Sequence, residues 1–148
     1  MLQMIMPEQI PTFWGSLEEM LRKALPIIPG ETDEKYNNIL TKLLEGVMTC
    51  WVAYHEEDGE KISNGIGITM VINEIITETK SLLIYAMATL EGKNASLQDY
   101  QEGIEALRKY AKSLGCNRVT SYTDNEYLVN MAKNIGGVSS YTFIAFPI

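Results

Sequence analysis

The sequence is poor in the residues that build metal sites and disulfide frameworks. It has two cysteines, Cys50 and Cys116, and a single histidine, His55. The cysteines lack the close spacing of a zinc site, and two are too few for a disulfide framework. One histidine leaves no spare imidazole for a zinc site or for a Ser-His-Asp triad. We therefore expect two buried free thiols, a solvated His55 at a strand end, and no bound metal.

Positive charge is scarce as well. The chain has 12 Lys and Arg residues against 19 Asp and Glu residues, which gives a formal net charge of −7 at pH 7. Proteins that bind duplex nucleic acid gain much of their affinity by neutralising phosphates. An acidic chain without a basic run is therefore not expected to bind nucleic acid.

Long apolar segments are also missing. The longest apolar run, residues 82–90, is about half as long as a membrane-spanning helix. The N-terminal stretch MLQMIMPEQIP has no basic residue and too short an apolar segment for a signal peptide. We expect a cytoplasmic protein without a membrane segment.

What the chain does have is the hydrophobic content of one globular domain. Of its 148 residues, 46% are hydrophobic, which suits a core between two or three layers. No linker, repeat or low-complexity segment divides the sequence. We expect a single domain over residues 1–148.

A short strand at residues 2–6 and then two helices are predicted at the start. Apolar residues recur at helical spacing over residues 10–24, and a stretch with proline and glycine follows them. The second helix begins with Thr32 or Asp33 as its cap and ends at Gly46.

Three strands in an antiparallel meander are predicted next. Residues 47–55 alternate in polarity, Asp58-Gly59 supplies a hairpin turn, and residues 65–75 alternate again. A second turn near residues 77–81 leads to residues 82–90, LLIYAMATL. This third strand is apolar on both faces, so we expect it to be central in the sheet.

The rest of the chain reads as helix, strand, helix and strand. The strongest helical pattern runs from Leu97 to Leu114, followed by a strand at 116–123, a helix at 125–135 and a final strand at 138–146. The predicted fold class is α/β (α+β). It has a mixed, twisted sheet of about six strands and about four helices, in the order β-α-α-β-β-β-α-β-α-β.

This order resembles that of the GCN5-related N-acetyltransferase (GNAT) superfamily, and the chain is similar to small GNAT-like proteins of tailed bacteriophages. The resemblance covers nearly the whole chain and is carried by PEQIPTFWGSLEEMLRKAL, GVMTCWVAY, IEALRKYAKSLGCNRVTSYT and NEYLVNMAKNIGG. It implies acetyl-CoA as the acyl donor. It also implies that the strand at 82–90 parts from a neighbour, so that the backbone of Ala88, Thr89 and Leu90 contacts the acyl-pantetheine.

The loop after this strand departs from the superfamily pattern. Members usually carry several glycines there, whose amides wrap the pyrophosphate at a helix N-terminus. Residues 91–99, EGKNASLQD, offer Gly92 alone, so Gly92, Asn94 and Ser96 would face the pyrophosphate. Ser96 and Asp99 also have the spacing of a helix capping box, which would occupy amides that could otherwise hold phosphate. The sequence therefore argues against tight CoA binding.

The catalytic side chains also depart from the pattern. Superfamily members often place a tyrosine in the last helix to protonate the CoA thiolate, but the matching position here is Ala132. Tyr127 could replace it if the helix were rotated, and otherwise it packs onto the sheet. Glu74 and Glu91 are candidate bases for the amine, each acting through a water, unless they are solvated turn residues.

Two functions from different classes follow. The first is N-acetyl transfer from acetyl-CoA to an amine on a small molecule or a protein, with backbone amides stabilising the oxyanion. The second is a non-catalytic phage protein of the same fold, acting as a virion component or meeting a host protein. The first function would be exercised in the cytoplasm, that of the host if a phage encodes the protein, and the second could place it in the virion.

Overall fold

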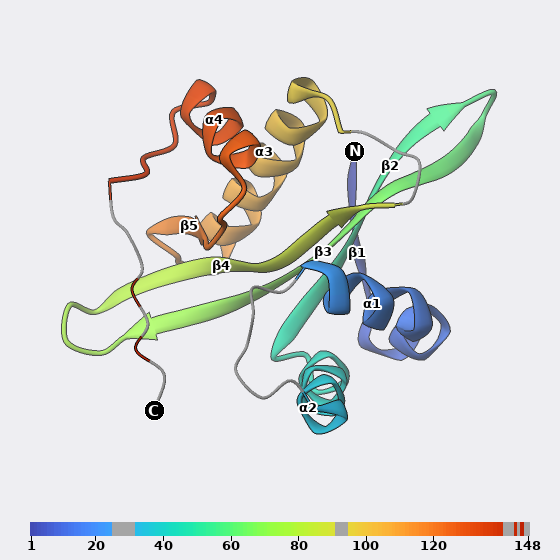
Figure 1. The fold of residues 1–148 in the computed structure, drawn as a ribbon, viewed down its shortest axis with the longest axis horizontal. Helices are drawn as coiled ribbons and strands as arrows, with labels where there is room; N and C mark the ends of the chain where they lie inside the picture. Colours follow the sequence, from blue (N-terminus) through green and yellow to red (C-terminus); the bar gives the residue numbers. More distant parts are fainter. Residues whose placement is uncertain (25–31, 91–94, 141–143, 145, 147–148) are drawn as a thin grey trace.

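One mixed five-stranded sheet forms the centre of the protein. The computed structural model describes residues 1–24, 32–90, 95–140, 144 and 146. The strands are β1 (Leu2–Ile5), β2 (Met48–Glu57), β3 (Glu60–Glu74), β4 (Thr79–Thr89) and β5 (Arg118–Ser121). They lie in the order β1-β2-β3-β4-β5. Strands β1 to β4 pair antiparallel, and β5 pairs parallel to β4 (Figure 1).

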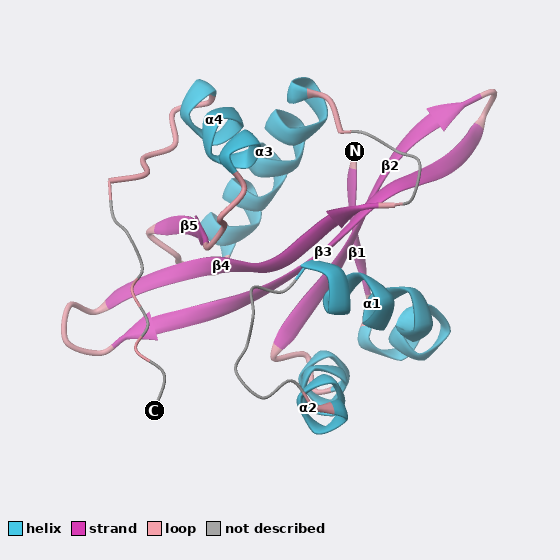
Figure 2. Ribbon diagram, in the orientation of Figure 1, coloured by secondary structure: helices cyan, strands magenta, loops and turns pink. Residues whose placement is uncertain are grey.

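Helices cover both faces of the sheet (Figure 2). A short 3-10 turn, η1 (Pro7–Gln9), leads into α1 (Ile10–Ala24), and α2 (Asp33–Leu44) packs on the same face as α1. The opposite face carries α3 (Leu97–Ser113), and α4 (Glu126–Asn134) lies beside α3. The predicted four helices and three-strand meander are thereby confirmed.

The α1 helix is amphipathic because its apolar residues recur every three or four positions. Leu17 and Leu21 are completely buried, and Ile10 is 1% exposed. They share one core cluster with residues of α2 and of the sheet, including Tyr36 and Ile68. Burial of this stripe fixes α1 over the middle of the sheet.

The two hairpins of the meander are closed by turns with left-handed backbone conformations. Asp58 and Gly59 have φ values of 51° and 82°, as the two central residues of a type I′ turn require. The β3–β4 turn has Glu78 at φ 54°, and the Thr77 hydroxyl donates to the Glu74 carboxylate at 2.7 Å. Both predicted turns are confirmed.

The strand predicted at residues 138–146 is not observed in the described part of that segment. Residues 138–140, 144 and 146 are not in a strand, and residues 141–143 and 145 lie outside the described residues. Val138, Ile144 and Phe146 are 85%, 68% and 86% exposed. A segment with strand propensity forms a strand only where its side chains pack against neighbours. These three side chains are exposed, so they lack that packing. Over the described residues the sheet therefore has five strands, where about six were predicted.

The predicted central position of the strand holds for part of β4: Leu82, Leu83 and Ile84 are at most 5% exposed between β3 and β5, whereas beyond Ile84 no described strand pairs with β4 on the β5 side. Both cysteines are free, but only Cys50 is buried, and Cys116 is half-buried. Burial raises the pKa of the Cys50 thiol to about 12. None of the described helices is both long and apolar enough to cross a membrane.

Candidate functional site

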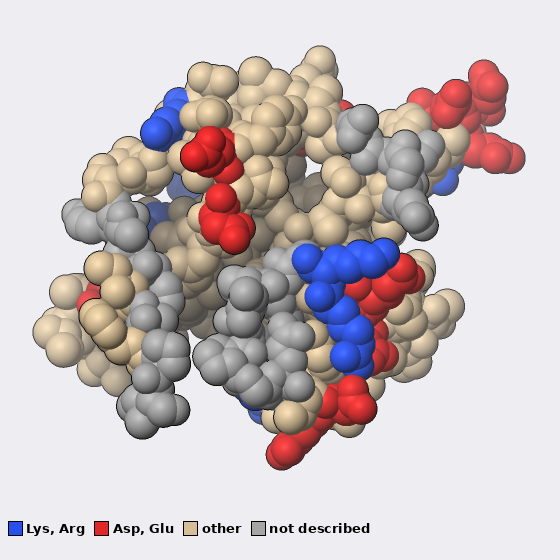
Figure 3. All heavy atoms as spheres, viewed as in Figure 1, with Lys and Arg blue, Asp and Glu red and all other residues tan. Residues whose placement is uncertain are grey.

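Strands β4 and β5 run together for a short distance and then part. Their pairing starts at Ser81 with Arg118 and ends at Ile84 with Ser121. Beyond Ile84, β4 continues to Thr89, and no described strand pairs with it on the β5 side. We call the space beside this unpaired edge, residues 85–89, the slot. Figure 1 shows β4 passing beneath α3, and Figure 3 shows a hollow in the surface below α3 and α4.

A β-bulge marks the point where the strands part. On β3, Thr69 pairs with Ile84 and the preceding Ile68 pairs with Ala86, so Tyr85 is an extra residue in β4. A bulge bends its strand and increases the local twist. Because Tyr85 directly follows the last residue that pairs with β5, the bulge turns β4 away from β5 and opens the slot.

The backbone groups that face the slot follow from the hydrogen bonds to β3. The Leu90 amide donates to the Asn64 carbonyl at 3.0 Å. The carbonyl of Ala88 also points toward β3. A Cβ atom placed on Gly65 of β3 would lie only 3.3 Å from the Ala88 oxygen. Backbone groups of successive residues in a strand point to opposite sides. The backbone amides of Met87 and Thr89 therefore face the slot.

The sequence had assigned pantetheine contacts to Ala88, Thr89 and Leu90, and the structure separates these three residues. Thr89 presents its amide to the slot, whereas the main chains of Ala88 and Leu90 face β3. Met87, which the sequence did not single out, lies on the slot side. The position of the bulge would have been needed to predict this, because it decides which later residues of β4 direct their backbone groups toward β3 and which toward the slot.

Buried side-chain contacts connect the sheet beside the slot to α3. The indole of Trp51 donates to the Thr69 hydroxyl at 2.9 Å, and both side chains are buried. Tyr110 of α3 packs edge-on against Trp51 with ring centroids 4.9 Å apart. Since Thr69 pairs with Ile84 beside the bulge, this contact fixes β3 and α3 at the level where the slot begins.

A small pocket lies at the β1 side of α3. Its volume is about 20 Å³, which is room for a single water. The Asn64 side-chain oxygen is buried there without a partner among the described residues, and one water could satisfy it. The pocket is too small for a cofactor and is lined by Met1, Leu2, Ala53, Asn64, Asp99 and Gly103.

The predicted capping box at the start of α3 is confirmed. The Asp99 amide donates to the Ser96 hydroxyl oxygen at 3.1 Å, and the Ser96 amide donates to the Asp99 carboxylate at 3.0 Å. The Ser96 hydroxyl also donates to this carboxylate, at 2.7 Å. These bonds lower the pKa of Asp99. An ionised carboxylate therefore lies at the helix end where a pyrophosphate would bind.

The Asp99→Asn variant should be about 1 kcal/mol less stable than the wild type at pH 7, because it loses the carboxylate of the capping box. The pKa of Asp99 is lower in the folded protein than in the unfolded chain. Its contribution is therefore present above the unfolded value of about 4 and is lost as the pH falls through the folded value. Urea unfolding at several pH values measures the effect.

The control for Asp99→Asn is Asp124→Asn, which removes an exposed carboxylate from the loop before α4. The control variant should track the wild type within about 0.5 kcal/mol at every pH. Equal unfolding free energies for Asp99→Asn and wild type at pH 7 would contradict the assigned role of the capping box.

The structure does not bring Glu74 to the slot. Glu74 pairs with Thr79 at one end of the β3–β4 hairpin, whereas Thr89 pairs with Gly65 at the other end. The ten residue steps along β4 from Thr79 to Thr89 span about 33 Å at the usual strand rise. The Glu74 carboxylate accepts a hydrogen bond from Thr77, so it is a turn residue.

The remaining predicted positions are distributed as follows. Tyr127 lies in the first turn of α4 and is 60% exposed, so it does not pack onto the sheet. Ala132 lies in the same helix and carries no acidic proton. Glu91, Gly92 and Asn94 lie outside the described residues.

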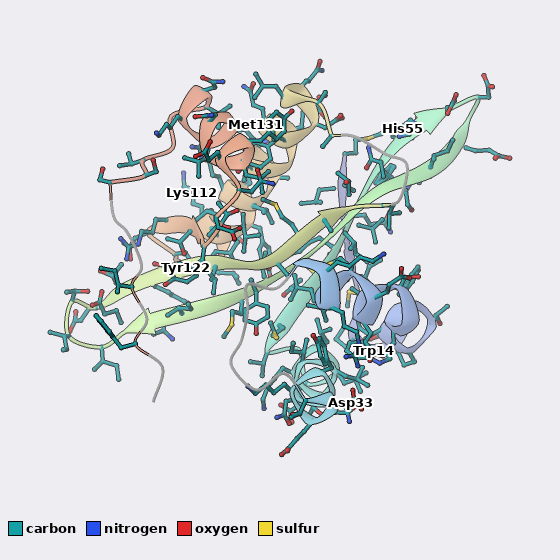
Figure 4. The ribbon with its side chains drawn as sticks, in the orientation of Figure 1. Trp14, Asp33, His55, Lys112, Tyr122 and Met131 are labelled. Carbon is teal, nitrogen blue, oxygen red and sulfur yellow. The ribbon has the colours of Figure 1, made fainter. Side chains whose placement is uncertain are left out.

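Acidic side chains gather at more than one place in Figure 3, and some of them lie beside the hollow below α4. Figure 3 shows acidic side chains at the projecting tip of the β2–β3 hairpin, where Glu57 ends β2, Asp58 lies in the turn and Glu60 begins β3. His55 lies on β2 just before this turn (Figure 4), with its side chain 40% exposed and 3.6 Å from Glu57. Among the described residues, no group of three His, Cys, Asp or Glu side chains could hold a metal ion.

Comparison with solved structures identifies acetyltransferases of this fold. A probable acetyltransferase matches with a TM-score of 0.71 and 11% identity, over 100% of this chain and 97% of that chain. The aminoglycoside acetyltransferase AAC(6')-Iy with a CoA bisubstrate analogue matches with a TM-score of 0.71 and 12% identity, over 100% and 97%. A ribosomal-protein-alanine N-acetyltransferase from Brucella melitensis biovar Abortus 2308 matches with a TM-score of 0.67 and 10% identity, over 100% and 99%.

Comparison of sequences alone does not detect this similarity. No family model matches the chain, and no curated protein sequence matches it. Because the structural matches are far below 25% identity, they show the fold alone: the chain folds like GNAT acetyltransferases. Three of the matched structures, all of AAC(6')-Iy, contain CoA or a CoA-derived ligand.

Proposed function

We propose that the protein transfers the acetyl group of acetyl-CoA to an amine, and that the slot is the site of transfer. The observation that carries the proposal is the parting of β4 from β5 at the Tyr85 bulge. It leaves the amides of Met87 and Thr89 without a partner on that side among the described strands. Acetyl transferases of the same fold that bind CoA support the assignment of the acyl donor.

The slot fits the acyl-pantetheine arm. An extended amide-containing chain can pair with the free edge of a strand in the way that a peptide does. The amides of Met87 and Thr89 are the donors available for this pairing. An amide aimed at the acyl oxygen would also stabilise the negative charge that develops there during transfer.

The start of α3 fits a pyrophosphate less well. The Asp99 amide is already bonded within the capping box, and the Asp99 carboxylate repels an anion. The amides of Leu97 and Gln98, in the same turn, have no acceptor among the described residues, so they remain available to phosphate oxygens. We therefore infer binding of acetyl-CoA that depends mainly on the slot and is weaker than a glycine-rich loop would give.

The acceptor is an amine-bearing molecule, small or protein. Matched structures include enzymes named for aminoglycosides and for a ribosomal protein, so the fold accommodates both kinds. Of the two carboxylates proposed as bases, Glu74 is too distant from the slot. Glu91 remains our candidate for the base that deprotonates the amine, through a water.

Titration calorimetry with acetyl-CoA tests the proposal, together with the shift in melting temperature at millimolar acetyl-CoA. Ligand that binds the folded state raises the melting temperature by mass action. Release of CoA in the presence of a panel of amines then tests turnover. No heat and no shift would reject the proposal and favour the non-catalytic alternative, an interaction protein of a phage that meets a host protein or enters the virion.

A further inference from the structure

Trp51 lies on the α3 face of the sheet, in one row with two residues of the neighbouring strands. It pairs with Gly67 of β3, and Gly67 pairs with Met87 of β4. Directly opposite residues of paired strands direct their side chains to the same face of a sheet. Trp51 is 7% exposed, and Met87 packs against the buried cluster to which Trp51 belongs. The row therefore places a large side chain beside a β4 residue whose amide faces the slot.

The indole of Trp51 is held from two sides. Its N–H donates to the Thr69 hydroxyl at 2.9 Å. Thr69 lies two residues along β3 from Gly67, so the ring extends across the position of Gly67, where there is no side chain. On the other side, Tyr110 of α3 packs edge-on against the ring, with centroids 4.9 Å apart. Contacts from β3 and from α3 therefore keep the ring in place.

The bond between Trp51 and Thr69 is a polar contact inside an apolar cluster. Thr69 is 1% exposed, and the other buried members of the cluster around Trp51 are aliphatic, such as Ile84 and Leu107. A buried N–H without an acceptor is costly. Valine has the shape of threonine but offers no acceptor. The Thr69 hydroxyl therefore fixes the direction of the indole in addition to filling space.

The position of the bulge decides which β4 residue lies beside Trp51. With the bulge at Tyr85, which we call the bulged pairing, Gly67 lies opposite Met87. Without a bulge, Ala86 would lie opposite Gly67, and the Met87 amide would face β3, because each later residue of β4 would move by one position. The single methyl of Ala86 would leave a gap beside the indole, whereas a methionine side chain adapts to fill it. The row therefore favours the bulged pairing.

We propose that Trp51 is a positioning residue for the slot, held in place by the hydroxyl of Thr69. It keeps the β4 bulge at Tyr85, and this position of the bulge directs the amides of Met87 and Thr89 toward the slot. Trp51 and Thr69 act through β4 and not through contact with the ligand. The use of these amides by acetyl-CoA rests on the acyl transfer proposed above, whereas the position of the bulge can be measured in the free protein.

Exchange of individual backbone amides with solvent, followed by NMR, reports the position of the bulge. In the wild type the Ala88 amide, which faces β3, should exchange about a hundredfold more slowly than the Met87 amide, which faces the slot. Thr69→Val releases the indole, so the pairing without the bulge should become about tenfold more populated. The difference in exchange rate between the two amides should then fall to about tenfold.

Acetyl-CoA provides a second measurement on the same variant. A ligand that bonds to the amides of Met87 and Thr89 binds only the bulged pairing, so it shifts the population toward that pairing. Saturating acetyl-CoA should therefore slow the exchange of the Ala88 amide in Thr69→Val by about tenfold, which returns it to the rate of the free wild type.

Two variants serve as matched controls. Thr69→Ser keeps the hydroxyl and should keep the difference of about a hundredfold between Met87 and Ala88. Leu17→Ala removes a buried side chain on the α1 face, in a cluster that does not include Trp51, so it lowers the stability and should also keep the difference. If Thr69→Val does not fold, Trp51→Phe removes the same hydrogen bond from its other partner and should give the same loss.

The outcomes distinguish this inference from the proposed function. An undiminished difference in Thr69→Val, or an equal loss in Thr69→Ser or Leu17→Ala, would overturn the positioning role of Trp51. Acetyl-CoA that binds Thr69→Val without slowing the exchange of Ala88 would also overturn it, because binding would not depend on the bulge. Wild-type protein that does not bind acetyl-CoA would reject the proposed function, and the exchange of Ala88 and Met87 would still decide where the bulge lies.

Discussion

The Thr89→Pro variant should lose about tenfold to a hundredfold in acetyl-CoA affinity and transfer rate while it keeps its fold. Proline removes the one amide of Thr89 that faces the slot. The Thr89 side chain is exposed, so its loss costs little packing. Calorimetry with acetyl-CoA and initial rates of CoA release measure the effect, and thermal unfolding checks the fold.

Two controls distinguish the effect of losing the Thr89 amide from the effect of losing the Thr89 side chain and from the effect of losing a hydrogen bond between β4 and β3. Thr89→Ala keeps the amide and should behave as the wild type. Ala88→Pro removes an amide that faces β3, so it should lower the free energy of unfolding by about 3 kcal/mol, as a lost ladder bond with a steric clash does. If Thr89→Pro and Thr89→Ala bind acetyl-CoA equally, the Thr89 amide does not contact the ligand.

The Leu17→Ala variant should lower the free energy of unfolding by about 3 kcal/mol, because it leaves a cavity under α1. Leu17 is completely buried between α1 and the sheet, in the cluster that also contains Leu21 and Ile68. For a domain of this size the melting temperature should fall by about 10 °C. Chemical and thermal unfolding measure both quantities.

Phe13→Ala is the matched control on the same helix, one turn before Leu17. Phe13 is 37% exposed, so its truncation leaves no closed cavity and should cost about 1 kcal/mol or less. Equal losses in the two variants would show that α1 does not bury its stripe against the sheet as described.

Much of the fold could be predicted from local signals. The stripe of α1, the Asp58-Gly59 turn and the Ser96–Asp99 capping box each depend on residues close together in sequence. Such signals fix helix ends and hairpin turns without knowledge of the rest of the chain. The sequence LLIYAMATL likewise predicted the interior position that β4 has at Leu82, Leu83 and Ile84, but not the unpaired edge beyond them.

The last strand and the site could not be predicted in this way. Residues such as Val138 and Phe146 have strand propensity, but whether they form a strand depends on a neighbouring edge that sequence does not specify. The β4 residues are apolar on both faces, so no alternation of polarity reveals the extra residue at Tyr85. Without knowledge of the bulge, the sequence could not show that the backbone amides of Met87 and Thr89 face the slot while those of Ala88 and Leu90 face β3.

The bulge at Tyr85 has a consequence for alignment with distant relatives. Beyond Ile84, a chain that lacks the extra residue falls one position out of step with this one. At 10–12% identity, the residues of LLIYAMATL do not reveal this offset in an alignment. An amide that faces the slot is then aligned with an amide that faces β3. Where a relative lacks the extra residue, residue roles beyond Ile84 can be transferred only after a gap has been placed opposite Tyr85.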